Sequence, residues 1–159
     1  MSIGDSALDY FKENEIKSKK KTTYPSDDKF YAVEFSSKYD IYEKVGFHVK
    51  KNDKRFIMHE IAGRTFIEFN KCLEKKRIAI KEIKEILPKV SVKTYNSDYR
   101  KKFGKSFAEV TDLKLEKGEI RIYCDNWEEK YIKEHGWDDS FNISLNTNKF
   151  LNWINNEAY

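Results

Sequence analysis

Hydrophobic and polar residues alternate along the first half of the chain. Residues 30–36 are rich in aromatic and β-branched side chains, and Val45, Phe47 and Val49 alternate with polar or small residues. A polar turn over residues 51–54 leads into a third alternating run, residues 55–61. A period of two is typical of strands with one buried face. We therefore expect a meander of three antiparallel strands here.

A second alternating region lies near residue 117. Two apolar runs flank the turn Glu116-Lys117-Gly118-Glu119, a sequence suited to a tight connection. This pattern predicts a β-hairpin whose apolar residues share one face. These residues are Val110, Leu113, Leu115, Ile120, Ile122 and Cys124.

Helical spacing of apolar residues predicts three helices before residue 90. The first covers Ser6 to Glu15. The second starts at Thr65-Phe66-Ile67-Glu68, which has the form of a capping box, and extends to Lys76-Arg77. The third begins near Ile80 and is stopped by Pro88, because proline disfavours the helical conformation in the residue before it.

The last third predicts a short helix, a strand and a closing helix. Asp125 or Asn126 is expected to cap a helix over residues 127–133. The alternation from Phe141 to Leu145 predicts a strand, and Asn146 or Thr147 is expected to cap the final helix. That helix has Phe150, Leu151 and Ile154 as its buried stripe, with Trp153 at the margin. Residues 90–100 suit either a loop or a short strand.

These elements together predict an α+β fold. At 159 residues the chain is large enough to bury one core, so we expect a single domain over residues 1–159. We expect an antiparallel or mixed sheet of roughly five to seven strands with helices packed on it.

The cysteines, the N-terminus and the lengths of the apolar runs indicate where the protein is located. Cys72 and Cys124 lack the paired spacing of a zinc site, and we expect two reduced, buried thiols. The N-terminus does not resemble a signal peptide, and no apolar run approaches the length of a membrane span. We therefore expect a soluble cytoplasmic protein without a membrane partner, and the abundance of Lys, Ile and Asn favours a bacterial or phage origin.

Charge is distributed unevenly along the chain. The net charge is +4, yet residues 107–159 contain eleven acidic and only six basic residues, which leaves residues 1–106 strongly basic. Within the acidic segment, aromatic residues interleave with carboxylates, as in protein interfaces that have aromatic anchors and a charged rim. We expect this surface to bind a basic protein, because it would repel nucleic-acid phosphates. The alternative is that both tryptophans fill the core beneath the final helix. The candidate partner-binding residues are Asp125, Trp127, Glu128, Glu129, Tyr131, Glu134, Trp137, Asp138 and Asp139.

No sequence pattern predicts a catalytic, metal or cofactor site. His59-Glu60-Ile61-Ala62-Gly63-Arg64 begins like a zinc-protease motif, but an arginine stands where the second histidine is required, and the alternation favours a strand. The other histidines, His48 and His135, are scattered, and we expect all three to be structural. Glycine-rich phosphate loops and nucleophile elbows are also missing from the sequence.

The order of elements from Tyr95 to Ile154 resembles that of the immunity proteins of contact-dependent growth inhibition systems. The stretch KTYNSDYRKKFGKSFAEVTDLKLEKGEIRIYCDNWE, followed by SFNISLNTNKFLNWI, is similar to their basic segment, hairpin, tryptophan-bearing loop, strand and closing helix. The resemblance implies a non-catalytic protein that binds the C-terminal toxin domain of its cognate partner, often a nuclease, and occludes its active site. Some relatives accept a toxin hairpin at an open sheet edge.

Two alternative functions remain open. A nucleic-acid-binding or phage accessory protein would use the basic segments Lys17 to Lys21 and Arg100 to Lys105. An enzyme with an unfamiliar site would instead require a pocket in which ionisable groups converge.

Overall fold

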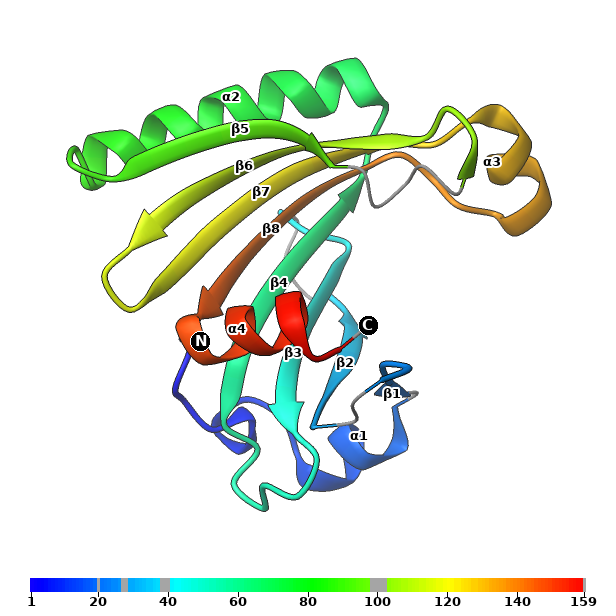
Figure 1. Cartoon of the computed structure of the whole chain (residues 1–159). Helices are drawn as coiled ribbons and strands as arrows, with labels where there is room; N and C mark the ends of the chain where they lie inside the picture. Colours follow the sequence, from blue (N-terminus) through cyan, green and yellow to red (C-terminus); the bar gives the residue numbers. More distant parts are fainter. Residues whose placement is uncertain (20, 27–28, 38–40, 98–102, 159) are drawn as a thin grey trace. The chain divides into compact units, whose positions relative to one another are not determined.

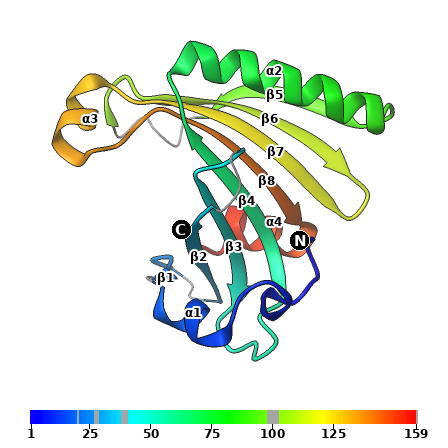
Figure 2. The ribbon, with the colours of Figure 1, turned by 180° about the vertical axis from the view of Figure 1, so that it is seen from behind.

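The computed structural model describes residues 1–19, 21–26, 29–37, 41–97 and 103–158. Within these residues, eight strands form an antiparallel sheet in the order β1-β2-β3-β4-β8-β7-β6-β5 (Figures 1 and 2). The strands are β1 (Lys21–Thr22), β2 (Phe30–Ser36), β3 (Lys44–Lys50), β4 (Met58–Phe66), β5 (Ser91–Ser97), β6 (Phe107–Leu115), β7 (Gly118–Asn126) and β8 (Ser140–Thr147).

The described helices are the short 3-10 helix η1 (Ala7–Asp9), α1 (Glu13–Ser18), α2 (Phe69–Ile86), α3 (Glu129–His135) and α4 (Asn148–Asn156). The predicted α+β class is confirmed. The described sheet has one strand more than the upper expectation of seven, because β1 was not predicted. Of the two alternatives for residues 90–100, the strand is observed, over residues 91–97.

The chain divides into two compact units. The first unit comprises Met1–Gly63, Lys117–Glu119 and Ser144–Tyr159, and the second comprises Arg64–Glu116 and Ile120–Ile143. The single domain over residues 1–159 stays a prediction.

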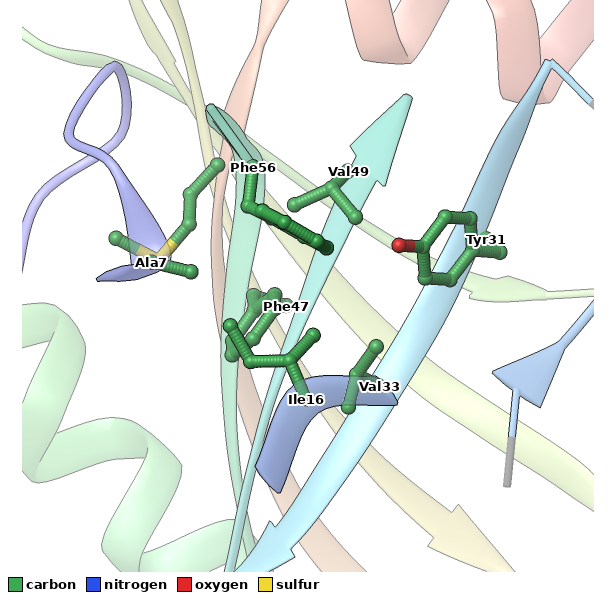
Figure 3. Close-up of a cluster of buried hydrophobic side chains, with 8 residues drawn as sticks. Ala7, Ile16, Tyr31, Val33, Phe47, Val49 and Phe56 are labelled. Carbon is green, nitrogen blue, oxygen red and sulfur yellow. The ribbon is translucent and has the colours of Figure 1, made fainter. Parts of the chain in front are cut away.

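The first unit has a hydrophobic cluster on one face of β2 and β3. Antiparallel pairing places Tyr31 opposite Val49 and Val33 opposite Phe47, and these side chains share a face. Ile16 of α1 packs on the same face (Figure 3). This contact attaches α1 to the strands. The cluster consists of Ala7, Ile16, Tyr31, Val33, Phe47, Val49, Phe56 and Met58.

The opposite face of β2 and β3 is covered by α4. Phe30 lies 4.9 Å from the Trp153 ring and 5.7 Å from the Phe150 ring, centroid to centroid. The predicted cap of this helix is confirmed at Thr147, whose hydroxyl accepts a hydrogen bond from the Phe150 amide. The marginal position predicted for Trp153 is wrong, because only 1% of this residue is exposed.

In the second unit, α2 lies along β5 and β6 (Figure 1). Cys72 of α2 and Cys124 of β7 form a disulfide bond with their Cα atoms 5.8 Å apart. The prediction of two reduced thiols is therefore wrong: sequence spacing says little about which cysteines meet, and here a helix and a strand bring them together. One helical turn after Cys72, the Lys76 ammonium donates to the carbonyl oxygen of Glu109 at 2.9 Å and to its carboxylate at 3.1 Å.

The boundaries of α2 differ from the prediction at both ends. Thr65 and Phe66 belong to β4, and the helix is capped instead by Glu68, whose carboxylate accepts from the amides of Asn70 and Lys71. Those hydrogen bonds also lower the pKa of Glu68. The two helices expected on either side of Arg77 form one continuous helix that ends at Ile86.

Three further local predictions are corrected. The single helix expected over residues 6–15 is replaced by η1 and α1. The β6–β7 hairpin is confirmed, but Val110 lies on the opposite face from Leu113, because an odd number of positions separates them. The helix α3 begins after Glu128, without the side-chain cap expected from Asp125 or Asn126.

Reduction of the Cys72–Cys124 bond should lower the free energy of unfolding by about 4 kcal/mol, because the bond closes a loop across 52 positions in the unfolded chain. Urea unfolding with and without reductant measures the change, and the intact mass confirms that two hydrogens were added. A Cys72→Ser, Cys124→Ser double variant serves as control and should not respond to reductant. Equal unfolding free energies for the oxidised and reduced protein would contradict the prediction.

Candidate functional site

Four aromatic side chains gather where β7, α3 and β8 meet. We call Phe103, Trp127, Tyr131 and Trp137 the α3 aromatic cluster. The ring centroids of Trp127 and Trp137 are 4.5 Å apart, and that of Phe103 lies 4.9 Å from Trp137 and 5.6 Å from Tyr131. All four residues are half-buried. The cluster therefore presents aromatic surface to solvent while its rings support one another.

The chain path around α3 brings the two tryptophans together. Trp127 directly follows β7, and α3 ends at Gly136, which adopts a left-handed conformation with φ of 65°. Its amide donates to the carbonyl oxygen of Ile132 at 2.9 Å, a common way to end a helix. Trp137, the next residue, packs against the ring of Trp127. Both tryptophans pack on Phe103 and on each other. These ring contacts differ from the alternative that both tryptophans fill the core beneath the final helix.

Sequence reasoning missed Phe103, which lies between lysines and was assigned to a basic segment. Its position depends on Glu128, whose carboxylate accepts from the Lys105 amide at 2.6 Å. The Glu128 amide in turn donates to the Ser106 hydroxyl at 2.9 Å. Gly104 has φ of 62°, and a Cβ at this position would meet the Glu128 carboxylate. Glu128 therefore holds the turn that carries Phe103, and glycine suits position 104 because most other residues are strained in this left-handed conformation.

Two more predicted acidic residues also hold the fold. Asp125 is 3% exposed, and its carboxylate accepts from the Ser140 hydroxyl and the Asn142 amide group, each at 3.2 Å. Asp139 accepts from the Trp127 amide at 2.8 Å. Burial raises the pKa of Asp139, because it disfavours the charged carboxylate more than this hydrogen bond favours it.

The remaining three acidic residues are exposed. Glu129 forms an ion pair with Lys133 at 2.6 Å, which lowers the pKa of the carboxylate, and Glu134 lies 4.0 Å from Lys130. Asp138 lies in the segment between α3 and β8. We call these three residues, which lie on α3 or shortly after it, the acidic rim of the α3 aromatic cluster. Lys130 and Lys133 of α3 offset much of the negative charge of this rim.

A second group of ionisable side chains lies in the first unit. The Tyr24 hydroxyl is 2.6 Å from Nε2 of His48, and Nδ1 of His48 is 2.6 Å from the Glu60 carboxylate. The side chains of His48 and Glu60 are each 11% exposed. This chain of hydrogen bonds joins residues from a loop, β3 and β4. It satisfies three polar groups that would be costly to bury alone.

An irregularity in β4 adds His59 to the same face. The His59 ring lies 5.1 Å from Phe30, beneath α4, while Glu60 reaches His48 on that face. Successive residues of a regular strand point to opposite faces, so this segment has the character of a β-bulge. Burial and the neighbouring Lys50 lower the pKa of His59, and the side chain of Lys149 lowers that of Lys50. The structural role predicted for the histidines stays a prediction.

Three of the lysines assigned to a nucleic-acid site contact other side chains of the protein itself. Lys17 pairs with Glu13 at 2.6 Å, and the ammonium groups of Lys19 and Lys21 lie over the rings of Phe35 and Tyr31. Lys20 and residues 100–102 lie outside the described residues.

Groups of three or more side chains able to hold a metal ion do not occur among the residues that the structure describes. Within the same residues, none of the helices has the length and apolar character needed to cross a bilayer. Comparison with protein-family models, curated proteins and solved structures gives no match.

Replacing Asp139 by Asn should maintain or raise the free energy of unfolding at neutral pH, because Asn keeps an acceptor for the Trp127 amide without a charge. Asp139→Ala should lower it by about 1–2 kcal/mol, because that amide loses its partner. A raised pKa favours the folded state at low pH, and this contribution is lost as pH rises through the pKa. The advantage of Asn should therefore grow with pH.

Urea unfolding of both variants from acidic to neutral pH measures these differences. The exposed neighbour offers a matched control, since Asp138→Asn should leave stability unchanged at every pH. An Asn variant at position 139 that is as unstable as the Ala variant would show that the charge itself is required.

Proposed function

We propose that this chain is a non-catalytic immunity protein that binds and neutralises a cognate toxin domain. The α3 aromatic cluster, with its acidic rim, forms the contact surface. The observation that carries the proposal is the cluster itself: half-buried rings from two separate segments, held by Glu128 and Asp139. Rigid aromatic side chains with a polar rim are the usual anchors of protein interfaces.

A sheet edge supports the same proposal. β5 is the last strand in the sheet order, and within the described residues it has a strand neighbour on one side, β6. Most of its residues are exposed. An edge strand of this length offers backbone groups to another chain, as the resemblance to immunity proteins implies.

The proposed location depends on the redox state of the cysteines. An immunity protein that meets a delivered toxin inside the cell works in the cytoplasm, which is the predicted location. Disulfides persist in oxidising compartments and are rare in the cytoplasm. The Cys72–Cys124 bond therefore favours an oxidising location. The intact mass of protein trapped directly from cells distinguishes the two locations.

The function is tested by protection of growth. The proposal predicts that the gene of a large secreted protein directly precedes this one. The C-terminal domain of that protein should arrest growth when expressed alone, and co-expression of this chain should restore it. A toxin domain from an unrelated system is the control and should remain toxic. Arrest that persists despite a folded, expressed chain contradicts the proposal.

Neutralising the acidic rim should slow association with the toxin domain. The triple variant Glu129→Gln, Glu134→Gln, Asp138→Asn should reduce the association rate constant by roughly threefold to tenfold at low salt and less at high salt, because steering by surface charge is screened. Glu128 and Asp139 are kept, because both hold the fold.

Surface plasmon resonance with immobilised toxin domain measures this rate. A matched control replaces three exposed glutamates elsewhere, Glu13, Glu74 and Glu82, by Gln. Equal rates for the two triple variants would remove the α3 surface from the proposal.

A further inference from the structure

The Cys72–Cys124 bond joins two segments of the second unit that lead to the α3 aromatic cluster. Cys124 lies in β7, three positions before Trp127, and Cys72 lies in the first turn of α2. Both cysteines are fully buried. Because closely packed interiors transmit small displacements, a change at the two sulfurs affects both segments.

Hydrogen bonds connect the start of α2 to the cluster through Asp139. The carbonyl oxygen of Asp139 accepts from the Ile67 amide at 3.1 Å, and its carboxylate accepts from the Phe69 amide. The same carboxylate accepts from the Trp127 amide at 2.8 Å. Asp139 therefore holds the start of α2 and the start of the α3 region at once.

Ser140, the residue after Asp139, contacts both sides of the disulfide bond. Its hydroxyl donates to the Asp125 carboxylate at 3.2 Å, and Asp125 directly follows Cys124. Its carbonyl oxygen lies 3.6 Å from the Cys72 sulfur. A disulfide sulfur has no hydrogen to donate, whereas a thiol at this position can donate to that oxygen. The reduced protein therefore has a replacement interaction that the oxidised protein lacks.

We propose that the Cys72–Cys124 bond is a redox switch for the α3 aromatic cluster. In the oxidised protein the bond keeps the start of α2 on Asp139, and the rings of Trp127 and Trp137 pack on each other. In the reduced protein the two sulfurs need more room, and the Cys72 thiol donates to the Ser140 carbonyl oxygen instead. The hydrogen bonds of Asp139 then loosen, and the aromatic surface becomes less ordered.

The chemistry of the switch requires a dithiol as reductant. A thiolate of the dithiol attacks one sulfur, the S–S bond breaks, and a mixed disulfide forms. The second thiolate of the dithiol displaces the protein thiolate and closes a disulfide within the reductant. Two electrons and two protons thereby pass from the dithiol to the cysteines. Because both sulfurs are buried, α2 must open locally before the attack, so reduction without denaturant should be slow.

This inference deepens the proposed function, because it concerns the same surface, and its biological meaning rests on that function. Thiols stay reduced in the cytoplasm and form disulfides in oxidising compartments. The chain would therefore bind its partner more tightly where the Cys72–Cys124 bond forms.

The test uses the full chain labelled with fluorotryptophan and observed by fluorine NMR. The three resonances are assigned with the variants Trp127→Phe, Trp137→Phe and Trp153→Phe. Reduction with dithiothreitol should shift the Trp127 and Trp137 resonances or broaden them by about twofold or more. Trp153 belongs to the first unit, so its resonance is an internal control and should not change.

Reoxidation tests whether the change is reversible. Glutathione disulfide takes up two electrons and two protons from the two thiols, reforms the bond and should restore the first spectrum. Identical cluster resonances in both redox states, with the state confirmed by intact mass, would overturn the proposal. Movement of all three resonances to their positions in urea would also overturn it, because reduction would then unfold the chain. A spectrum that reoxidation does not restore would likewise exclude a switch.

Matched variants locate the coupling. Asp139→Ala removes the shared acceptor and should reduce the redox response of Trp127 by about threefold or more. Asp138→Ala changes the exposed neighbour and should leave the response unchanged. A full response in Asp139→Ala would overturn the proposal, because the coupling runs through this carboxylate. These measurements contain no toxin domain, so their failure is distinguishable from a failure of growth protection.

Discussion

The attachment of α2 to the strands of the second unit is the constraint on which this unit depends. The Cys72–Cys124 bond and the buried Lys76 ammonium on Glu109 hold successive turns of the helix. Burial lowers the pKa of Lys76, and the contact with Glu109 opposes that shift. The residues before α2 reach the α3 region, where the Ile67 amide donates to the carbonyl oxygen of Asp139 at 3.1 Å. The anchored helix is thereby connected to the α3 region through the segment that precedes it.

Among the described residues, some carboxylates hold the fold while others are exposed to solvent. Asp125, Glu128 and Asp139 accept hydrogen bonds from neighbouring segments, so their charge serves local structure. Asp112 of β6 also holds neighbouring strands together. Its carboxylate accepts from Arg121 at 2.7 Å and from the Tyr95 hydroxyl at 3.1 Å. Counting charges along a segment therefore overstates the field it presents to solvent, because buried and paired carboxylates contribute little to it.

Much of the fold could be predicted from local patterns, and the errors have a common physical origin. The β6–β7 hairpin and the Thr147 cap depend on residues close in sequence, and both are confirmed. At Thr65 a capping pattern was present, yet pairing within the sheet extended β4 through that position. Among the candidate site residues, the aromatic interleaving located three members of the cluster. Phe103 was missed because its contacts come from a turn more than twenty positions away.

The sequence by itself determined the class of fold, the hairpin, the closing helix and the grouping of tryptophans with acidic residues, because each depends on the period of the chain and on nearby residues. Only the tertiary structure decided the pairing of Cys72 with Cys124, the contact of Tyr24 with His48 and Glu60, and which carboxylates remain exposed. These features require residues distant in sequence to meet. Distance in space depends on how helices and strands pack, and that information is spread over the whole chain.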